Sequence, residues 1–213
     1  GMVETMRMEG HTALVHTAAA SSLGIMLNKI CLAEDVPLVN IVRKQEQVDI
    51  LKEVGAKIVI NSSSDTFKKD LYKAIEQTGA TLAFDAIGGG ELVSDILTAM
   101  EAVGSKDATG FNTYGSVSNK QVYIYGGLDF SPTTLNRAYG MTWGIGGWLL
   151  MRFLGKLEIP KILELHKRVA DEINTTFAID FSDELTLEET MQPQNIARYF
   201  AKKTGEKYLV NPS

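Results

Sequence analysis

The segment from Thr12 to Gly24 constrains the fold more than any other part of this chain. It reads Thr-Ala-Leu-Val-His-Thr-Ala-Ala-Ala-Ser-Ser-Leu-Gly, so an apolar run ends in a series of very small side chains. An amphipathic pattern that starts at Ile25 follows directly. This order is typical of a buried strand, a tight turn and a helix, the first unit of a dinucleotide-binding fold. Small residues suit such a turn because the backbone must approach a diphosphate, and the helix N-terminus offers unpaired N–H groups to that anion.

The turn matches the glycine fingerprint G-x-G-x-x-G only in part. In this register the three glycine positions fall on Ala19, Ser21 and Gly24. Ala19 needs an ordinary backbone angle, and Gly24 would allow close packing of the helix on the strand. Ser21 limits close approach, although its hydroxyl offers a donor to a phosphate. The alternative is an ordinary buried strand and helix joined by a turn of small residues, and a fingerprint of this kind is a hypothesis until other turns support it.

Composition excludes several other classes of protein. The formal net charge of −5 argues against nucleic acid or an anionic membrane as the main partner. Cys31 is the single cysteine, and the histidines (His11, His16 and His166) lack the spacing of metal ligands, so neither a disulfide nor a zinc site is expected. We interpret His16 as a strand-end histidine rather than a catalytic one. The chain starts without a signal-peptide pattern, and its most apolar stretch, 143–154, is too short to span a bilayer, so a cytoplasmic location is expected.

Strand and helix patterns alternate along the first 125 residues of the chain. After the first unit we expect four further strands, at 37–42, 57–60, 81–85 and 121–125. We expect helices at 45–54, from a cap at Ser64 or Asp65 to about 77, and at 91–103. Such repetition predicts an α/β fold, a Rossmann doubly wound parallel sheet with helices on both faces.

The pattern changes in the last third of the chain. The stretch 104–120 is interpreted as a long surface loop, followed after the fifth strand by helices at 141–154, 160–176 and 193–203. Residues 177–187 are expected to be extended and mixed, and 207–210 to form a last strand. We therefore expect a core for binding NAD(P) at 1–130, with 131–213 adding C-terminal helices and a closing strand to the same domain.

The predicted topology gathers several small-residue turns at one edge. In a doubly wound sheet the first and fourth strands lie side by side, and a ligand lies across the carboxyl ends of the strands. Because independent turns converge there, a nucleotide site is favoured over an ordinary turn. The candidate cofactor-binding residues are Ala19, Ala20, Ser21, Ser22, Leu23, Gly24, Arg43, Lys44, Asn61, Ala86, Ile87, Gly126, Gly127 and Leu128.

The end of the second strand indicates which cofactor is preferred. NAD sites usually carry an acid about twenty residues beyond the turn, where it accepts a hydrogen bond from the ribose 2′-hydroxyl. Here that place holds Arg43 and Lys44, and the first acid is Glu46, within the next helix. Two cations attract a 2′-phosphate, and arginine can bind it with two parallel hydrogen bonds. Solvated charges at a loop are the alternative, but the missing acid favours NADPH over NADH.

Five segments carry a resemblance to a known family. They are Ala13–Gly24, Val42–Arg43, Leu51–Asn61, Phe84–Gly89 and Thr204–Val210. Together they resemble the medium-chain dehydrogenase/reductase superfamily, which includes the zinc-type alcohol dehydrogenases, and above all its zinc-independent branch of NADPH:quinone oxidoreductases. The resemblance covers nearly the whole chain, and the loop at 104–120 is longer than is usual in the family.

The resemblance implies an NADPH-dependent oxidoreductase that transfers hydride to a quinone, enone or carbonyl acceptor. Family members carry an N-terminal substrate domain before the cofactor-binding domain, whereas 2–6 resembles the last turns of the helix that leads into the first Rossmann strand. The chain therefore resembles an isolated cofactor-binding domain. No residue matches a family catalytic position, so no catalytic residue is named, and little turnover is expected from this chain alone. An apolar face left without its domain favours self-association, and a homodimer is expected.

Two other functions remain open at this point. One is a module that binds NADPH without catalysis, as a sensor or a structural subunit. The other is a methyltransferase of similar fold. The methyltransferase is disfavoured because it would require an acid for the ribose hydroxyls where this chain has Arg43.

Overall fold

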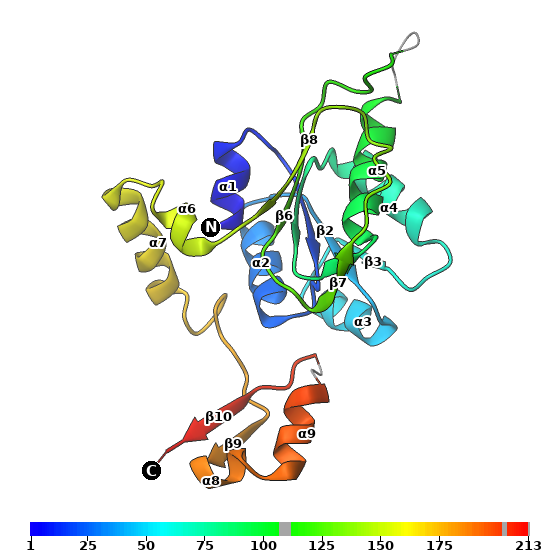
Figure 1. Ribbon diagram of the computed structural model, residues 1–213. Coiled ribbons are helices and arrows are strands. Elements are labelled where there is room, and N and C mark those ends of the chain that lie inside the picture. The colour runs from blue at the N-terminus through cyan, green and yellow to red at the C-terminus, as the bar shows by residue number, and fades with distance from the viewer. Residues whose placement is uncertain (107–111, 202–203, 213) are drawn as a thin grey trace.

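The chain folds around a six-stranded parallel sheet (Figure 1). The computed structural model describes residues 1–106, 112–201 and 204–212. The strand order is β3-β2-β1-β4-β6-β8. The strands are β1 (Leu14–Thr17), β2 (Leu38–Val42), β3 (Ile58–Asn61), β4 (Leu82–Asp85), β6 (Lys120–Ile124) and β8 (Trp143–Gly147). Since β1 lies between β2 and β4, the predicted α/β fold and its neighbouring first and fourth strands are confirmed.

Helices cover both faces of this sheet (Figure 1). On one face α1 (Met2–Met8), α2 (Ser22–Ala33) and α3 (Gln45–Glu53) pack on even-numbered residues of β1 and β2. On the other face lie α4 (Phe67–Thr78) and α5 (Leu92–Gly104). Alternate side chains of a strand point to opposite faces, so β1 divides its residues between two apolar cores. These helices agree with the predicted ones, except that α4 begins after Thr66, one to two residues beyond the predicted cap.

The helix predicted at 141–154 is wrong over its first half. Residues Trp143–Gly147 form β8 and pair with β6, and only Leu150–Leu154 are helical, as α6. Glycine is a poor helix former, and this stretch contains three. Trp143 and Ile145 alternate with Gly144 and Gly146 and pack on the core beside α5, which is the period of a strand.

The remaining elements lie outside the main sheet. They are β5 (Gly88–Gly90), β7 (Asp129–Thr133), α7 (Ile159–Asp171), β9 (Asp183–Thr186), α8 (Leu187–Thr190), α9 (Pro193–Ala201) and β10 (Tyr208–Asn211). The last two strands pair with each other in parallel, and Figure 1 shows their unit set apart from the main sheet. The helix expected at 160–176 ends at Asp171, and the extended stretch at 177–187 contains β9.

Two predictions fall partly outside the described residues. Of the loop predicted at 104–120, residues 107–111 are not described, and 112–119 contain neither helix nor strand. Of the helix predicted at 193–203, the last two residues are not described. Within the described ranges, no helix is both long enough and apolar enough to cross a membrane.

Candidate functional site

The turn after β1 is tight and begins with a left-handed residue. Ala18 has φ of 49°, a conformation that costs a non-glycine residue free energy. Ser21 then caps α2, and its hydroxyl oxygen accepts a hydrogen bond from the N–H of Gly24 at 3.2 Å. The N–H groups of Ser22 and Leu23 in the same first turn have no partner within the helix and remain available to an anion. The left-handed position is thus one residue earlier than the first glycine of the fingerprint, while Ala19 keeps an ordinary backbone angle.

Gly24 lets the helix pack directly on this turn. A Cβ atom built on Gly24 would lie 2.1 Å from the carbonyl oxygen of Ala19. No side chain fits at that distance, so the third position of the fingerprint requires glycine for close packing. The first turn of α2 is thereby held against the end of β1.

The ends of β1 and β4 are joined by a buried hydrogen-bond network. The Thr17 hydroxyl donates to Asp85 Oδ1 at 2.6 Å and accepts from the N–H of Ala86 at 2.9 Å. Asp85 also accepts from the N–H groups of Ile87 and Gly88, at 3.2 and 2.7 Å. The carboxylate therefore fixes the turn that follows β4, beside the turn that follows β1.

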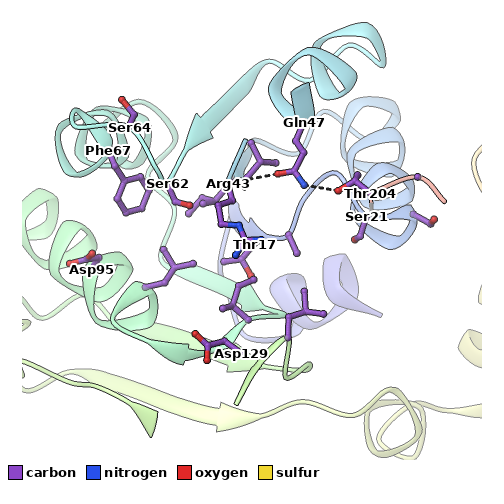
Figure 2. Close-up of a pocket in the computed structure, with 18 of the residues that line it drawn as sticks. Thr17, Ser21, Arg43, Gln47, Ser62, Ser64, Phe67, Asp95, Asp129 and Thr204 are labelled. Carbon is purple, nitrogen blue, oxygen red and sulfur yellow. Dashed lines mark hydrogen bonds between the residues drawn. The ribbon is translucent and has the colours of Figure 1, made fainter. Parts of the chain in front are cut away.

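A cleft of about 910 Å³ opens at this carboxyl edge of the sheet (Figure 2). It is lined by residues at and after the ends of the first four strands, by residues of the helices α2 to α5, by two residues that follow β6, and by a segment near the C-terminus. These residues are Thr17, Ala18, Ser21, Ser22, Ile41, Val42, Arg43, Gln47, Ser62, Ser64, Asp65, Phe67, Lys68, Ile87, Leu92, Asp95, Leu128, Asp129, Thr204, Gly205, Glu206 and Lys207. Its volume lies within the range of small-molecule and cofactor sites.

The cleft brings together five of the predicted site residues, namely Ser21, Ser22, Arg43, Ile87 and Leu128. The others do not line it. They are Ala19, Ala20, Leu23, Gly24, Lys44, Asn61, Ala86, Gly126 and Gly127. Most of the small residues in this second group are buried within the turns, where they allow close packing.

Two polar residues of the second group bond to their neighbours instead of facing the cleft. The Lys44 ammonium lies 3.2 Å from the Glu46 carboxylate, so the acid that follows this turn pairs with Lys44. The Asn61 side chain accepts a hydrogen bond from the N–H of Ser63 and shapes the turn after β3.

Arg43 is a cation directed into the cleft. Figure 2 shows its side chain extending from the end of β2 toward Thr17. Among the described residues it makes no ion pair, whereas Lys68 in the same cleft lies 2.9 Å from Asp95. An unpaired guanidinium in a concave site is suited to bind a phosphate or carboxylate.

Several lining residues were missed by the sequence reasoning. Ser62 and Ser64 follow the third strand, so the rule that ligands bind at the carboxyl ends of strands could have included them. Gln47 is the third residue of α3, where a glutamine signals a capping box. The segment Thr204–Lys207 carries no local signal, because only the tertiary fold brings it to the cleft.

His16 does not line the cleft. Its Nε2 atom is 2.7 Å from the Tyr125 hydroxyl, and its Nδ1 atom has no hydrogen-bond partner among the described residues. Complete burial lowers the pKa of His16 to about 4, so the ring is neutral at pH 7. In the described part of the chain, no three His, Cys, Asp or Glu side chains group as metal ligands.

No family model matches this chain. Solved structures do match it over nearly its whole length. A candidate NADPH:quinone reductase from Mesorhizobium loti is 24% identical, with a TM-score of 0.76 over 99% of this chain and 56% of that one. Another from Bacillus thuringiensis is 15% identical, with a TM-score of 0.68 over 94% of this chain and 56% of that one. A mutant enoyl thioester reductase from Candida tropicalis is 20% identical, with a TM-score of 0.61 over 93% of this chain and 53% of that one.

These matches establish the fold. The chain spans little more than half the length of each of these structures. This chain therefore shares its fold with the matching part of these reductase structures.

Proposed function

We propose that this chain, with the fold of part of a medium-chain reductase, is the NADPH-binding domain of an oxidoreductase. The observation that carries the proposal is the Arg43 guanidinium at the end of β2, which makes no ion pair within the described part of the chain and lines a cleft at the carboxyl edge of the sheet. An acid at this place would favour NADH, and the first acid after it in the sequence, Glu46, pairs with Lys44. Arg43 is accordingly assigned to the 2′-phosphate of NADPH.

The turn after β1 fits the cofactor's diphosphate. Ala18 and Gly24 bring the first turn of α2 against the end of β1, and Ser21 and Ser22 line the cleft there. The N–H groups of this first turn and the partial positive charge of the helix N-terminus would hold the anion. The Ser21 hydroxyl keeps its proton free to donate, because its oxygen is the atom that caps the helix.

Apolar side chains supply the rest of the surface. Phe67, Leu92, Ile87 and Leu128 are among the residues that line the cleft. The rings of a dinucleotide would pack on such side chains while Arg43 and the α2 turn fix its charged groups. When bound, NADPH supplies the hydride, and this chain orients it and excludes water from the bound face.

We further propose a quinone, enone or similar carbonyl compound as the acceptor. The names of the matched structures support this class, since they include NADPH:quinone reductases, a 2-enoyl thioester reductase Etr1p/Etr2p, and a complex of Etr1p with NADP and crotonyl-CoA. The residues that bind the acceptor are not assigned to this chain. We expect this chain to bind NADPH yet to oxidise the bound NADPH only slowly with quinones or enones. Hydride transfer depends on an enclosed and oriented acceptor.

The test compares two neutralising variants of adjacent cations. Arg43→Gln should weaken NADPH binding by about 1.5–3 kcal/mol and leave NADH binding nearly unchanged, because it removes a charge-assisted hydrogen bond to the phosphate. Lys44→Gln is the matched control, since Lys44 lies outside the cleft and pairs with Glu46. Fluorescence titration with both cofactors measures the effect. Equal affinity of the unaltered protein for NADPH and NADH would refute the proposed preference.

A further inference from the structure

Gln47 connects two parts of the cleft wall that are far apart in the sequence. Its Oε1 atom accepts hydrogen bonds from the N–H groups of Arg43 and Lys44, at 3.0 and 3.1 Å. Its Nε2 atom donates to the Thr204 hydroxyl at 2.6 Å. Figure 2 shows this series of hydrogen bonds from Arg43 through Gln47 to Thr204 along one side of the cleft.

The orientation of the Gln47 amide follows from its partners. Two backbone N–H groups require an acceptor, so the oxygen must face the turn after β2. The nitrogen must then face Thr204, whose oxygen accepts the bond and whose own proton stays available. One side chain thus holds the backbone that carries Arg43 and, at the same time, the segment near the C-terminus.

The segment held by Gln47 faces the same cleft. Residues Thr204–Lys207 all line it, and they lead into β10. The backbone of Lys207 is tied to Ser182 by hydrogen bonds in both directions, which connect the segment to the residue before β9. The Lys207 side chain makes no ion pair within the described ranges, so Lys207 joins Arg43 as a lining cation without a carboxylate partner there.

We propose that Gln47 is a positioning residue that couples the Arg43 turn to the segment 204–207, so that both form the binding site for the 2′-phosphate. The inference rests on the proposed function and adds the part of that site supplied by the C-terminal segment. Arg43 provides one side of the anion site, and the Lys207 ammonium of the segment 204–207 provides the other. Gln47 sets the distance between them.

This arrangement predicts a selective effect on affinity. Breaking the Gln47–Thr204 bond removes no group from the diphosphate turn or from the apolar walls. It lets the segment 204–207 move away from Arg43, which weakens the hold on the 2′-phosphate, the group that NADPH has and NADH lacks. A purely structural role would instead weaken binding of both cofactors to the same degree.

The sharpest variant is Thr204→Val, which removes the hydroxyl and keeps the shape of the side chain. We expect NADPH to bind about 3- to 10-fold more weakly, the range for removal of one hydrogen bond, and NADH to bind as before. Gln47→Met should lower NADPH affinity at least as much, and the double variant should be no worse than Gln47→Met because both changes break one link. Thr175→Val and Gln45→Met are matched controls, since both residues are exposed and lie outside the cleft.

Hydrogen exchange gives a second readout that does not depend on affinity. NADPH should slow the exchange of the backbone amides at 204–207 in the unaltered protein, and NADH should slow it less. Thr204→Val should abolish this difference, while circular dichroism should show the unaltered melting curve.

The possible outcomes separate the two proposals. If the unaltered protein prefers NADPH and Arg43→Gln removes the preference, but Thr204→Val and Gln47→Met bind as the controls do, the coupling is wrong and the proposed function stands. If both variants lose affinity for NADPH and NADH equally, Gln47 has only a structural role and the coupling is again wrong. If the unaltered protein binds neither cofactor, both proposals are overturned.

Discussion

The hydroxyl of Thr17 lies 2.6 Å from the carboxylate of Asp85, and this bond joins the ends of the two central strands. Both side chains are buried, and the same hydroxyl accepts from the N–H of Ala86. The turns after β1 and β4, which border the cleft, are therefore fixed by a single polar network.

We expect Thr17→Val to destabilise the fold by about 1–3 kcal/mol. The change removes one donor from a buried carboxylate and leaves the N–H of Ala86 without its acceptor. Urea denaturation measures the free energy of unfolding, and Thr113→Val at an exposed position serves as the control. A decrease in stability no greater than that of the control would contradict this role.

A second prediction concerns Gly24→Ala. The added methyl group would meet the Ala19 carbonyl oxygen at 2.1 Å, and a backbone atom cannot yield as a flexible side chain does. Overpacking costs typically about 1–3 kcal/mol, which exceeds the gain of about 1 kcal/mol from replacing glycine in a helix. Thermal unfolding should show a lower midpoint, with weaker NADPH binding in parallel.

Gly155→Ala provides the control for Gly24. A Cβ atom at Gly155 would meet its nearest neighbours at 3.6 and 3.7 Å, which are ordinary van der Waals distances. Its backbone is in the right-handed helical region, so alanine fits without strain. The Gly155→Ala variant should unfold at the same temperature as the unaltered protein or at a higher one. Equal destabilisation by alanine at Gly24 and at Gly155 would contradict the special role of Gly24.

The sequence predicted the sheet well because each of its first strands is a short apolar run between polar or glycine-bearing segments. The run at 37–42 illustrates this, since β2 is buried on both faces and its sequence is apolar except for the buried Asn40. The β8 strand was missed because Trp143 and Ile145 are separated by glycines whose neighbours are the side chains of β6. The alternation at 143–146 has the period of a strand, but the choice of β6 as its partner is tertiary and has no local signal.

The candidate site could be predicted only at its backbone turns. Ser21 and Arg43 directly follow strands, so their place at the carboxyl edge follows from topology. Lys44 is adjacent to Arg43 yet points elsewhere, because it pairs with Glu46. Which of two neighbouring cations enters a cleft depends on side-chain partners, and sequence does not specify these.

A third prediction concerns the buried ion pair of Glu101 and Lys120. The Lys120 ammonium is fully buried and lies 2.6 Å from Glu101, which also accepts hydrogen bonds from Ser105 and Ser116. Burial tends to raise the pKa of Glu101, but these donors lower it to about 2. This network therefore holds the residues after α5 to the start of β6.

Lys120→Met should cost about 3–5 kcal/mol, because a carboxylate would be left buried without its counter-charge. The double variant Glu101→Gln/Lys120→Met should recover part of this stability. Lys106→Met, which breaks the exposed pair with Glu76, should change stability by at most about 1 kcal/mol. Chemical denaturation of these proteins and of the single variant Glu101→Gln completes the test, and additive effects at Glu101 and Lys120 would show that the pair is not coupled.

The last prediction is a pH dependence that arises from His16. Burial lowers its pKa from 6.5 to about 4, so the unfolded chain binds a proton at this residue more readily than the folded protein does. The contribution of the neutral His16 ring to the free energy of unfolding is therefore fully present above pH 6.5, and it is lost as the pH decreases toward 4. A pKa shift of this size corresponds to a decrease of about 3 kcal/mol in the free energy of unfolding. His11, whose pKa is also lowered by burial, contributes in the same direction.

We expect His16→Phe to flatten most of this dependence between pH 6.5 and 4, whatever its effect at pH 7. The exposed His166→Gln variant should retain the slope of the unaltered protein. The free energy of unfolding at several pH values gives the slopes, and below pH 4.5 the titration of carboxylates such as Glu101 must be separated from them. A slope in His16→Phe equal to that of the unaltered protein would show that the buried ring is protonated as readily as in the unfolded chain. In that case the unpartnered Nδ1 atom would have to meet water or a proton acceptor when the ring is charged.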